Sequence, residues 1–151
     1  MVPNILVIEA PFYPNISRLL MEGAKAALLK ANAEFDCVSV PGALEIPTAI
    51  NFAVKGGGRG GRSYDGFVAL GCVIRGETHH FDIVATQSAR ALTDLGVNYG
   101  LCIGNGILTT YTEEQAMVRA DPAQMNKGGG AVDACLALIE LRYRMGARRD
   151  R

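Results

Sequence analysis

The sequence predicts an α/β fold in which helices cover both faces of a parallel sheet. Short apolar runs, ended by proline, glycine or polar residues, alternate with longer segments whose apolar residues recur at helical spacing. This alternation is typical of βαβ units, in which the strands run parallel. The 151 residues, 49% hydrophobic and 20% charged, are enough for one domain with a substantial core, and we expect that domain to span residues 1–151.

The apolar runs place the strands. The first run ends at Pro11 and the second at Pro41, and the third is apolar throughout and should be central in the sheet. In the fourth, Gly104 and Gly106 predict a bend or bulge. The four expected strands are residues 4–9, 35–40, 67–74 and 101–108.

The helical segments follow from a period near 3.6 residues. Asn15 is a candidate cap for the first helix, and Pro47 fits only the first turn of the second. The last helix is apolar nearly all round and should be buried, whereas residues 56–61 (GGGRGG) read as a flexible surface loop. The five expected helices are residues 16–31, 44–54, 81–95, 113–120 and 131–141.

Charge and cysteine content exclude several classes of protein. With 15 basic and 15 acidic residues, the formal net charge of +0 does not suggest a nucleic-acid or membrane partner. The tail is basic and its arginines should be solvated, and residues 146–151 should be frayed. These arginines are Arg142, Arg144, Arg148, Arg149 and Arg151. The four cysteines lie among apolar residues, where we expect each to pack as a small hydrophobic side chain. They contain no CxxC pair, so we expect no zinc or disulfide framework. We expect no signal peptide or membrane span and a cytoplasmic location.

Residues suited to ligand binding follow each predicted strand. In open parallel sheets, ligands bind beyond the carboxyl ends of the strands. Phe12 follows the first strand, residues 42–45 the second and residues 75–80 the third, and Asn105 follows the start of the fourth, at its expected bend. We therefore expect four strand ends to converge on one crevice.

The segment 76–80 (GETHH) has the features of an anion site. A glycine turn followed by a helix start presents backbone N–H groups, and the helix dipole adds positive potential. Thr78 either caps that helix or binds an oxyanion. Imidazole changes charge near neutral pH, so one of His79 and His80 is a candidate general acid or base, and their spacing does not favour a metal site.

Other residues complete the expected crevice. Phe12 either stacks on a planar ring or fills space, and Glu45 either accepts hydroxyl hydrogen bonds or stabilises a helix start. Arg119 and Lys127 are candidate phosphate ligands or ordinary surface charges, while Arg75 is expected to be structural. These features favour a cofactor-free transferase or lyase acting on a phosphorylated substrate.

The sequence resembles the 6,7-dimethyl-8-ribityllumazine synthase family from residue 5 to about residue 145. The resemblance rests on five motifs in the family's order and spacing. These are Phe12 with Ile16, PGALEIP at 41–47, GCVIRGETHHFD at 71–82, GILT at 106–109 with EQA at 114–116 and RA at 119–120, and NKG at 126–128.

The resemblance implies a flavodoxin-like, three-layer αβα sandwich with a four-stranded parallel sheet. It implies condensation of 5-amino-6-ribitylaminouracil with 3,4-dihydroxy-2-butanone 4-phosphate to the lumazine, phosphate and water, without metal or organic cofactor. It also implies a homopentamer with sites between subunits and riboflavin synthase as a candidate partner. The segment 121–125, which lacks the glycines of shell-forming members, predicts a free pentamer.

The resemblance also assigns roles to residues. Phe12 would stack on the pyrimidinedione ring, His80 would transfer protons, and Arg119 would clamp the phosphate from a neighbouring subunit. Many family members carry an aromatic residue at the position of Asn105, so the second wall of the ring pocket differs here. The remaining substrate-binding residues carried over are Ala43, Leu44 and Glu45 for the ribityl chain, Cys72, Val73 and Ile74 for the ring edge, Glu77 and Thr78 for the phosphate, and Lys127 near the site.

Two rival hypotheses stay open at this point. One is a flavin-binding or scaffold paralogue with weak synthase activity. The other is a generic flavodoxin-like phosphate or receiver domain, which the sequence disfavours because no acidic cluster follows the first strand.

Overall fold

The computed structural model describes residues 2–147 and contains one parallel sheet of four strands there. The strands lie in the order β2-β1-β3-β4, which is the flavodoxin-like order without a fifth strand. All neighbouring pairs are parallel, as the alternation of strands and helices predicted. The strands are β1 (Asn4–Glu9), β2 (Glu34–Ser39), β3 (Gly66–Ile74) and β4 (Ile103–Thr110).

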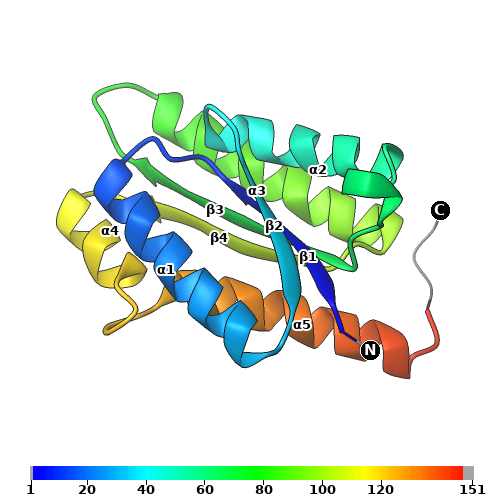
Figure 1. Ribbon diagram of the computed structural model, residues 1–151. Coiled ribbons are helices and arrows are strands. Elements are labelled where there is room, and N and C mark those ends of the chain that lie inside the picture. The colour runs from blue at the N-terminus through cyan, green and yellow to red at the C-terminus, as the bar shows by residue number, and fades with distance from the viewer. Residues whose placement is uncertain (1, 148–151) are drawn as a thin grey trace.

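Five α-helices of the described residues cover the two faces of this sheet. α1, α4 and α5 lie on one face and α2 and α3 on the other, which gives the expected αβα sandwich (Figure 1). Single 3-10 turns precede α2 (η1, Ala43–Glu45) and β3 (η2, Arg59–Gly61). The helices are α1 (Pro14–Lys30), α2 (Ile46–Lys55), α3 (His80–Tyr99), α4 (Glu113–Ala120) and α5 (Lys127–Arg144). None of the helices in residues 2–147 is long and apolar enough to cross a membrane.

The central strands supply a separate core to each face of the sheet. Side chains of β1 alternate, so Ile5 and Val7 pack under α1 and α5, and Leu6 and Ile8 pack under α2 and α3. The third strand is also flanked on both sides, by β1 and β4, which confirms its predicted central place. A sheet buried on both faces explains why these strands read as unbroken apolar runs.

The first helix starts differently from the prediction. Its N-cap is Tyr13, in extended conformation, and no side chain caps it. Pro14 occupies the first turn, where its missing N–H costs no hydrogen bond and its restricted φ suits a helix. Asn15 is therefore a residue of the helix and not its cap. In α2, Pro47 lies in the first turn as expected.

The predicted bulge in β4 is wrong. Pairing with β3 is continuous from Phe67 with Ile103 to Ile74 with Thr110. The two glycines serve instead to let α5 approach the sheet. A Cβ on Gly104 would overlap the carbonyl oxygen of Ala131, and one on Gly106 would lie 3.0 Å from the Cβ of Ala131.

The last helix is longer and less buried than predicted. It begins at Lys127, because the Asn126 side chain accepts a hydrogen bond from the Gly129 N–H at 3.3 Å and caps the glycine run. Only one face is buried, whereas Leu138 and Leu141 on another face are each 41% exposed. An apolar composition on all sides thus does not mean burial within one chain.

Two predictions about surface groups also change. Arg142 is a structural residue, since its guanidinium donates to the carbonyl oxygens of Gly100 and Asp65, both at 3.0 Å. Cys37 is exposed, while the other three cysteines are buried as expected. The expectation of a frayed tail falls mostly on residues 148–151, which lie outside the described residues.

Candidate functional site

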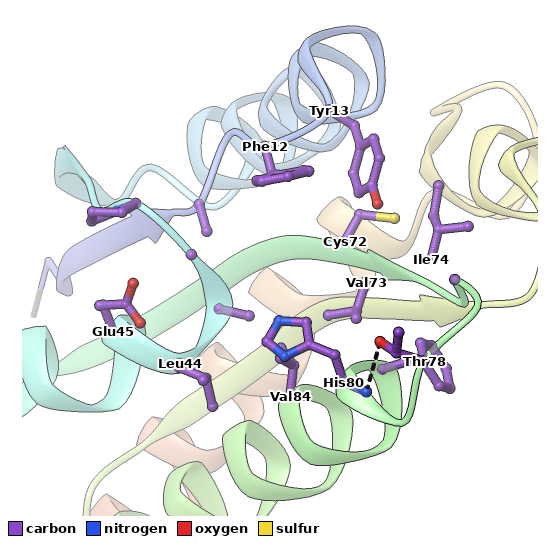
Figure 2. A pocket seen from close by; sticks show the side chains of 16 residues that line it. Phe12, Tyr13, Leu44, Glu45, Cys72, Val73, Ile74, Thr78, His80 and Val84 are labelled. Carbon is purple, nitrogen blue, oxygen red and sulfur yellow. Dashed lines mark hydrogen bonds between the residues drawn. The ribbon is translucent and has the colours of Figure 1, made fainter.

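A pocket of about 420 Å³ opens at the carboxyl ends of β1, β2 and β3 (Figure 2). The helices after β1 and β3 leave toward opposite faces of the sheet, and such a point is where open α/β sheets bind ligands. Its volume suits a small organic ligand. The lining residues are Ala10, Phe12, Tyr13, Pro41, Gly42, Ala43, Leu44, Glu45, Cys72, Val73, Ile74, Gly76, Thr78, His80, Phe81 and Val84.

The loop after β1 presents an aromatic ring. Ala10 donates its N–H to the Leu70 carbonyl at 2.9 Å, and Phe12 donates to the Ala10 carbonyl at 2.9 Å, so the chain turns tightly there. The ring of Phe12 is 70% exposed and lies over the pocket, with Tyr13 edge-on at 5.0 Å between ring centroids (Figure 2). An apolar ring held out of the core in this way is available for stacking.

The loop after β2 forms the second wall. Val40 donates to the Glu9 carbonyl at 2.9 Å, and Glu45 donates its backbone N–H to the Gly42 carbonyl at 3.1 Å, which closes η1. Leu44 and Glu45 consequently flank the pocket (Figure 2). Glu45 is the N-cap residue of α2 but makes no side-chain cap hydrogen bond, so its carboxylate is free to accept hydrogen bonds from a ligand.

The end of β3 forms the floor and carries Cys72, Val73 and Ile74. Burial raises the pKa of the Cys72 thiol to about 11, and the charge of Glu113 adds to this, while a hydrogen bond with Thr110 opposes it. The thiol is therefore neutral near pH 7 and is a poor nucleophile. The floor is apolar apart from its backbone groups.

The turn after β3 separates the two histidines. Thr78 accepts a hydrogen bond from the His80 N–H at 3.4 Å and also lines the pocket, so its hydroxyl serves the helix start and faces the ligand space. His80, the first residue of α3, projects into the pocket (Figure 2). His79 lies outside it and approaches Asp82, with 3.2 Å between Nδ1 and Oδ2. Glu77 does not line the pocket.

The remaining predicted residues lie in a second hollow. Asn105, Arg119 and Lys127 line a space of about 420 Å³ between β4, α4 and α5, which shares no residue with the first pocket. The expectation that four strand ends meet in one crevice of one chain is therefore wrong. The reason is that β4 continues to Thr110, so Asn105 is its third residue and not its end.

Side chains in this second hollow are held by local hydrogen bonds. Asn105 accepts from the Ile107 N–H at 2.9 Å, and Arg119 donates one guanidinium hydrogen bond to the Gln115 carbonyl at 3.0 Å. The guanidinium of Arg119 keeps further donors for an anion. Within the described residues, no three His, Cys, Asp or Glu side chains gather where a metal ion would bind.

Sequence reasoning missed some residues around the pocket. Tyr13, next to Phe12 at the start of a helix, lines it, and aromatic character at a strand-end loop was the available signal.

Arg75, expected to be structural, lies with its guanidinium 5.4 Å from the ring centroid of Tyr111, which is 6.0 Å from that of Phe81. This contact connects the loops after β3 and β4 beside the pocket.

Residues 3–143 match the sequence model of the family described as 6,7-dimethyl-8-ribityllumazine synthase. The chain belongs to this family. The match covers every strand and helix of the structure except the last residue of α5. Membership in the 6,7-dimethyl-8-ribityllumazine synthase family confirms the resemblance read from the five motifs and rules out a generic receiver domain.

Whole-length relatives agree with this family. The chain is 56% identical over 146 residues to 6,7-dimethyl-8-ribityllumazine synthase 1 of Rhizobium meliloti (strain 1021), covering 97% of this chain and 95% of the relative. It is 56% identical over 147 residues to the 6,7-dimethyl-8-ribityllumazine synthase of Bartonella tribocorum, with the same shares covered. The protein of that name in Agrobacterium fabrum is 54% identical over 144 residues, covering 95% of this chain and 97% of the relative. These names give no support to a flavin-binding scaffold.

Proposed function

We propose that the chain condenses 5-amino-6-ribitylaminouracil with 3,4-dihydroxy-2-butanone 4-phosphate to form 6,7-dimethyl-8-ribityllumazine, phosphate and water. The family and the relatives that share more than half of its residues carry this assignment to riboflavin biosynthesis. The observation that supports it in the structure is one pocket lined together by Phe12, Glu45, Thr78 and His80. The Phe12 ring suits stacking on a planar ring, and the Glu45 carboxylate can accept hydrogen bonds from a polyol. The Thr78 hydroxyl suits an anion, and the His80 imidazole can transfer a proton.

The aminouracil would occupy the part of the pocket below Phe12. Its ring stacks on the Phe12 face, and its edge meets the backbone of residues 72–74. The ribityl chain extends along residues 43–45, where the Glu45 carboxylate accepts hydrogen bonds from hydroxyl groups. This orientation uses the polar wall for the polyol and the apolar floor for the ring.

The phosphate of the second substrate would sit at the turn before α3. A helix of 20 residues places its positive dipole end there, and the Thr78 hydroxyl lines the same space. Nothing lies within 4 Å of the position that a Cβ would take on Gly76, so the turn is open to a ligand. The negatively charged Glu77 contributes through its backbone N–H and keeps its carboxylate away from the phosphate.

Catalysis would rest on proximity, with one residue moving protons. The amine of the aminouracil attacks the ketone of the butanone phosphate and forms a Schiff base with loss of water. Phosphate is then eliminated, the resulting enol becomes a ketone, and the ribitylamino nitrogen attacks this carbonyl and closes the ring with loss of a second water. Holding two reactants in contact supplies a large part of such acceleration. His80 is the imidazole in the pocket and transfers protons in these steps, whereas the neutral thiol of Cys72 takes no covalent role. No step requires a metal or organic cofactor.

A complete site would form between two subunits. The first pocket holds the stacking ring and the histidine, and the second hollow holds Asn105, Arg119 and Lys127. If the second hollow of one subunit faces the first pocket of the next, Arg119 can clamp the phosphate bidentately. A head-to-tail contact of this kind closes into a ring, in keeping with a homopentamer. The half-exposed Leu138 and Leu141 of α5 supply apolar surface for the contact.

The chain acts as one domain over residues 1–151 in the cytoplasm, as a free pentamer. Its lumazine product passes to riboflavin synthase, the candidate partner.

Formation of the fluorescent lumazine from the two substrates tests the activity. Purified protein should produce it faster than the spontaneous reaction in buffer. A rate equal to that of buffer alone would refute the proposed function.

Mixing two variants tests the shared site. His80→Ala damages only the first pocket and Arg119→Ala only the second hollow. If each site takes one half from each neighbour, mixed oligomers made by refolding equal amounts together contain intact sites at about one interface in four. Activity should return to about that fraction of wild type. Activity no higher than the mean of the separately refolded variants would place both residues in a site within one chain.

A further inference from the structure

We propose that the hydroxyl of Tyr13 donates a hydrogen bond to a carbonyl oxygen of the pyrimidinedione ring. This inference rests on the proposed function, and it concerns a residue to which neither the sequence motifs nor the comparisons give a role. Tyr13 then contributes to the affinity for the aminouracil, whereas other residues bind the butanone phosphate.

The backbone of Tyr13 aims its side chain at the pocket. As N-cap of α1 it is extended (φ −110°, ψ 100°), and its ring packs against the core under α1 while lining the pocket. Its ring lies edge-on to Phe12 at an interplanar angle of 68°. The phenol therefore has a defined position and does not swing freely in solvent.

The hydroxyl has no protein partner within residues 2–147. It points toward the side of the pocket formed by Cys72 (Figure 2), yet it makes no hydrogen bond with that thiol or with any other described group. A phenol O–H that is half enclosed and directed at apolar and thiol groups is a donor available to a ligand.

The pocket has polar side chains of different kinds on its different sides. Among its lining residues only Tyr13, Glu45, Thr78 and His80 carry a side-chain nitrogen or oxygen. Figure 2 places Glu45 on one side of the Phe12 ring and Tyr13 with Cys72 on the other. Thr78 belongs to the turn before α3 and already accepts from the His80 N–H. Tyr13 is thus the side-chain donor at the end of the pocket opposite Glu45.

The chemistry of the ligand matches this placement. A pyrimidinedione stacked under Phe12 with its ribityl chain toward Glu45 must direct its far edge toward Tyr13 and Cys72. That edge carries carbonyl oxygens, which need donors when they leave water. The thiol of Cys72 is a weak donor, and the phenol of Tyr13 is a strong one.

The test removes the hydroxyl and keeps the ring. In Tyr13→Phe, the dissociation constant for 5-amino-6-ribitylaminouracil alone, measured by titration calorimetry, should rise roughly tenfold, as expected for one lost hydrogen bond. The KM for the aminouracil should rise similarly, while kcat and the KM for butanone phosphate stay within about twofold. The matched control is Tyr143→Phe, the same change on a side chain that is 77% exposed.

The outcomes separate this inference from the proposed function. If wild type forms lumazine and Tyr13→Phe binds the aminouracil within twofold of wild type, the role of Tyr13 is refuted and the function stands. Equal increases of both Michaelis constants would also refute it, because they would indicate general damage to the pocket. If wild type binds the aminouracil but forms no lumazine, the proposed function fails. The dissociation constants of wild type and Tyr13→Phe for the aminouracil still test the role of Tyr13.

Discussion

Replacing Gly104 by alanine should strongly destabilise the fold, because this glycine allows α5 to touch the sheet. An added Cβ would overlap the Ala131 carbonyl oxygen and lie 2.7 Å from the carbonyl carbon and 3.3 Å from the Cα. Carbon atoms in protein interiors pack at about 3.5–4.0 Å, so α5 must retreat by about 1 Å. The retreat would loosen Val132, Cys135 and Ile139, which anchor α5 in the core.

The expected cost follows from overpacking of well-packed cores. Inserting a methyl group there costs about 1–3 kcal/mol, and a clash with backbone lies at the upper end, so we expect about 3 kcal/mol. For a chain of this size that corresponds to a fall in Tm of roughly 6–12 °C. Thermal unfolding followed by circular dichroism, at one fixed protein concentration, measures it.

Gly130→Ala is the matched control, since it adds the same atom to the helix that Gly104 contacts. A Cβ on Gly130 would have nothing within 4 Å, and alanine favours the helix, so stability should stay equal or rise by about 0.4–1 kcal/mol. A Tm for Gly104→Ala within 2 °C of wild type would refute the idea that this glycine sets the distance between α5 and β4.

Three further predictions concern the candidate site. Because burial raises the pKa of Cys72 to about 11, its thiol stays protonated at pH 8 and becomes reactive only as the pH approaches that value. Iodoacetamide at pH 8 should therefore label exposed Cys37 and spare Cys72 in peptide mass spectrometry, and rapid labelling of Cys72 would contradict the burial argument. His80→Ala should lower kcat by no more than about 100-fold, at the low end for general acid–base catalysis, whereas complete inactivity would show that proton transfer outweighs proximity. Arg119→Ala should raise the KM for butanone phosphate roughly tenfold or more, the loss expected for charge-assisted hydrogen bonds; an unchanged KM would remove Arg119 from the phosphate site.

Much of the fold could be predicted from local patterns. The strand Asn4–Glu9 and the helix Glu113–Ala120 were predicted at the residues observed, because an apolar run ended by proline and a period near 3.6 residues are local signals. Strand β3 was recognised as central because a strand covered on both faces is apolar at every position.

Predictions made from local sequence were wrong at glycine positions. Gly104 and Gly106 suggest a bulge when β4 is considered alone, and the helix predicted from residue 131 left out the glycine run at 128–130. In the structure Gly104 and Gly128 are places where backbone meets backbone: a Cβ on Gly104 would overlap the Ala131 carbonyl oxygen of α5, and one on Gly128 would overlap the Leu20 carbonyl oxygen of α1. No window of sequence contains both sides of such a contact.

Periodicity and motifs read along the chain were sufficient to predict the order of strands and helices, the residues that follow the first three strands, and the family. Tertiary packing was needed to show that His80 enters the pocket while His79 turns to Asp82, since neighbouring residues at a helix start point in different directions. It also separated Arg119 and Asn105 from that pocket and brought Tyr13 into it. Such placements depend on how the ends of different strands and helices pack, and that packing joins residues far apart in the chain.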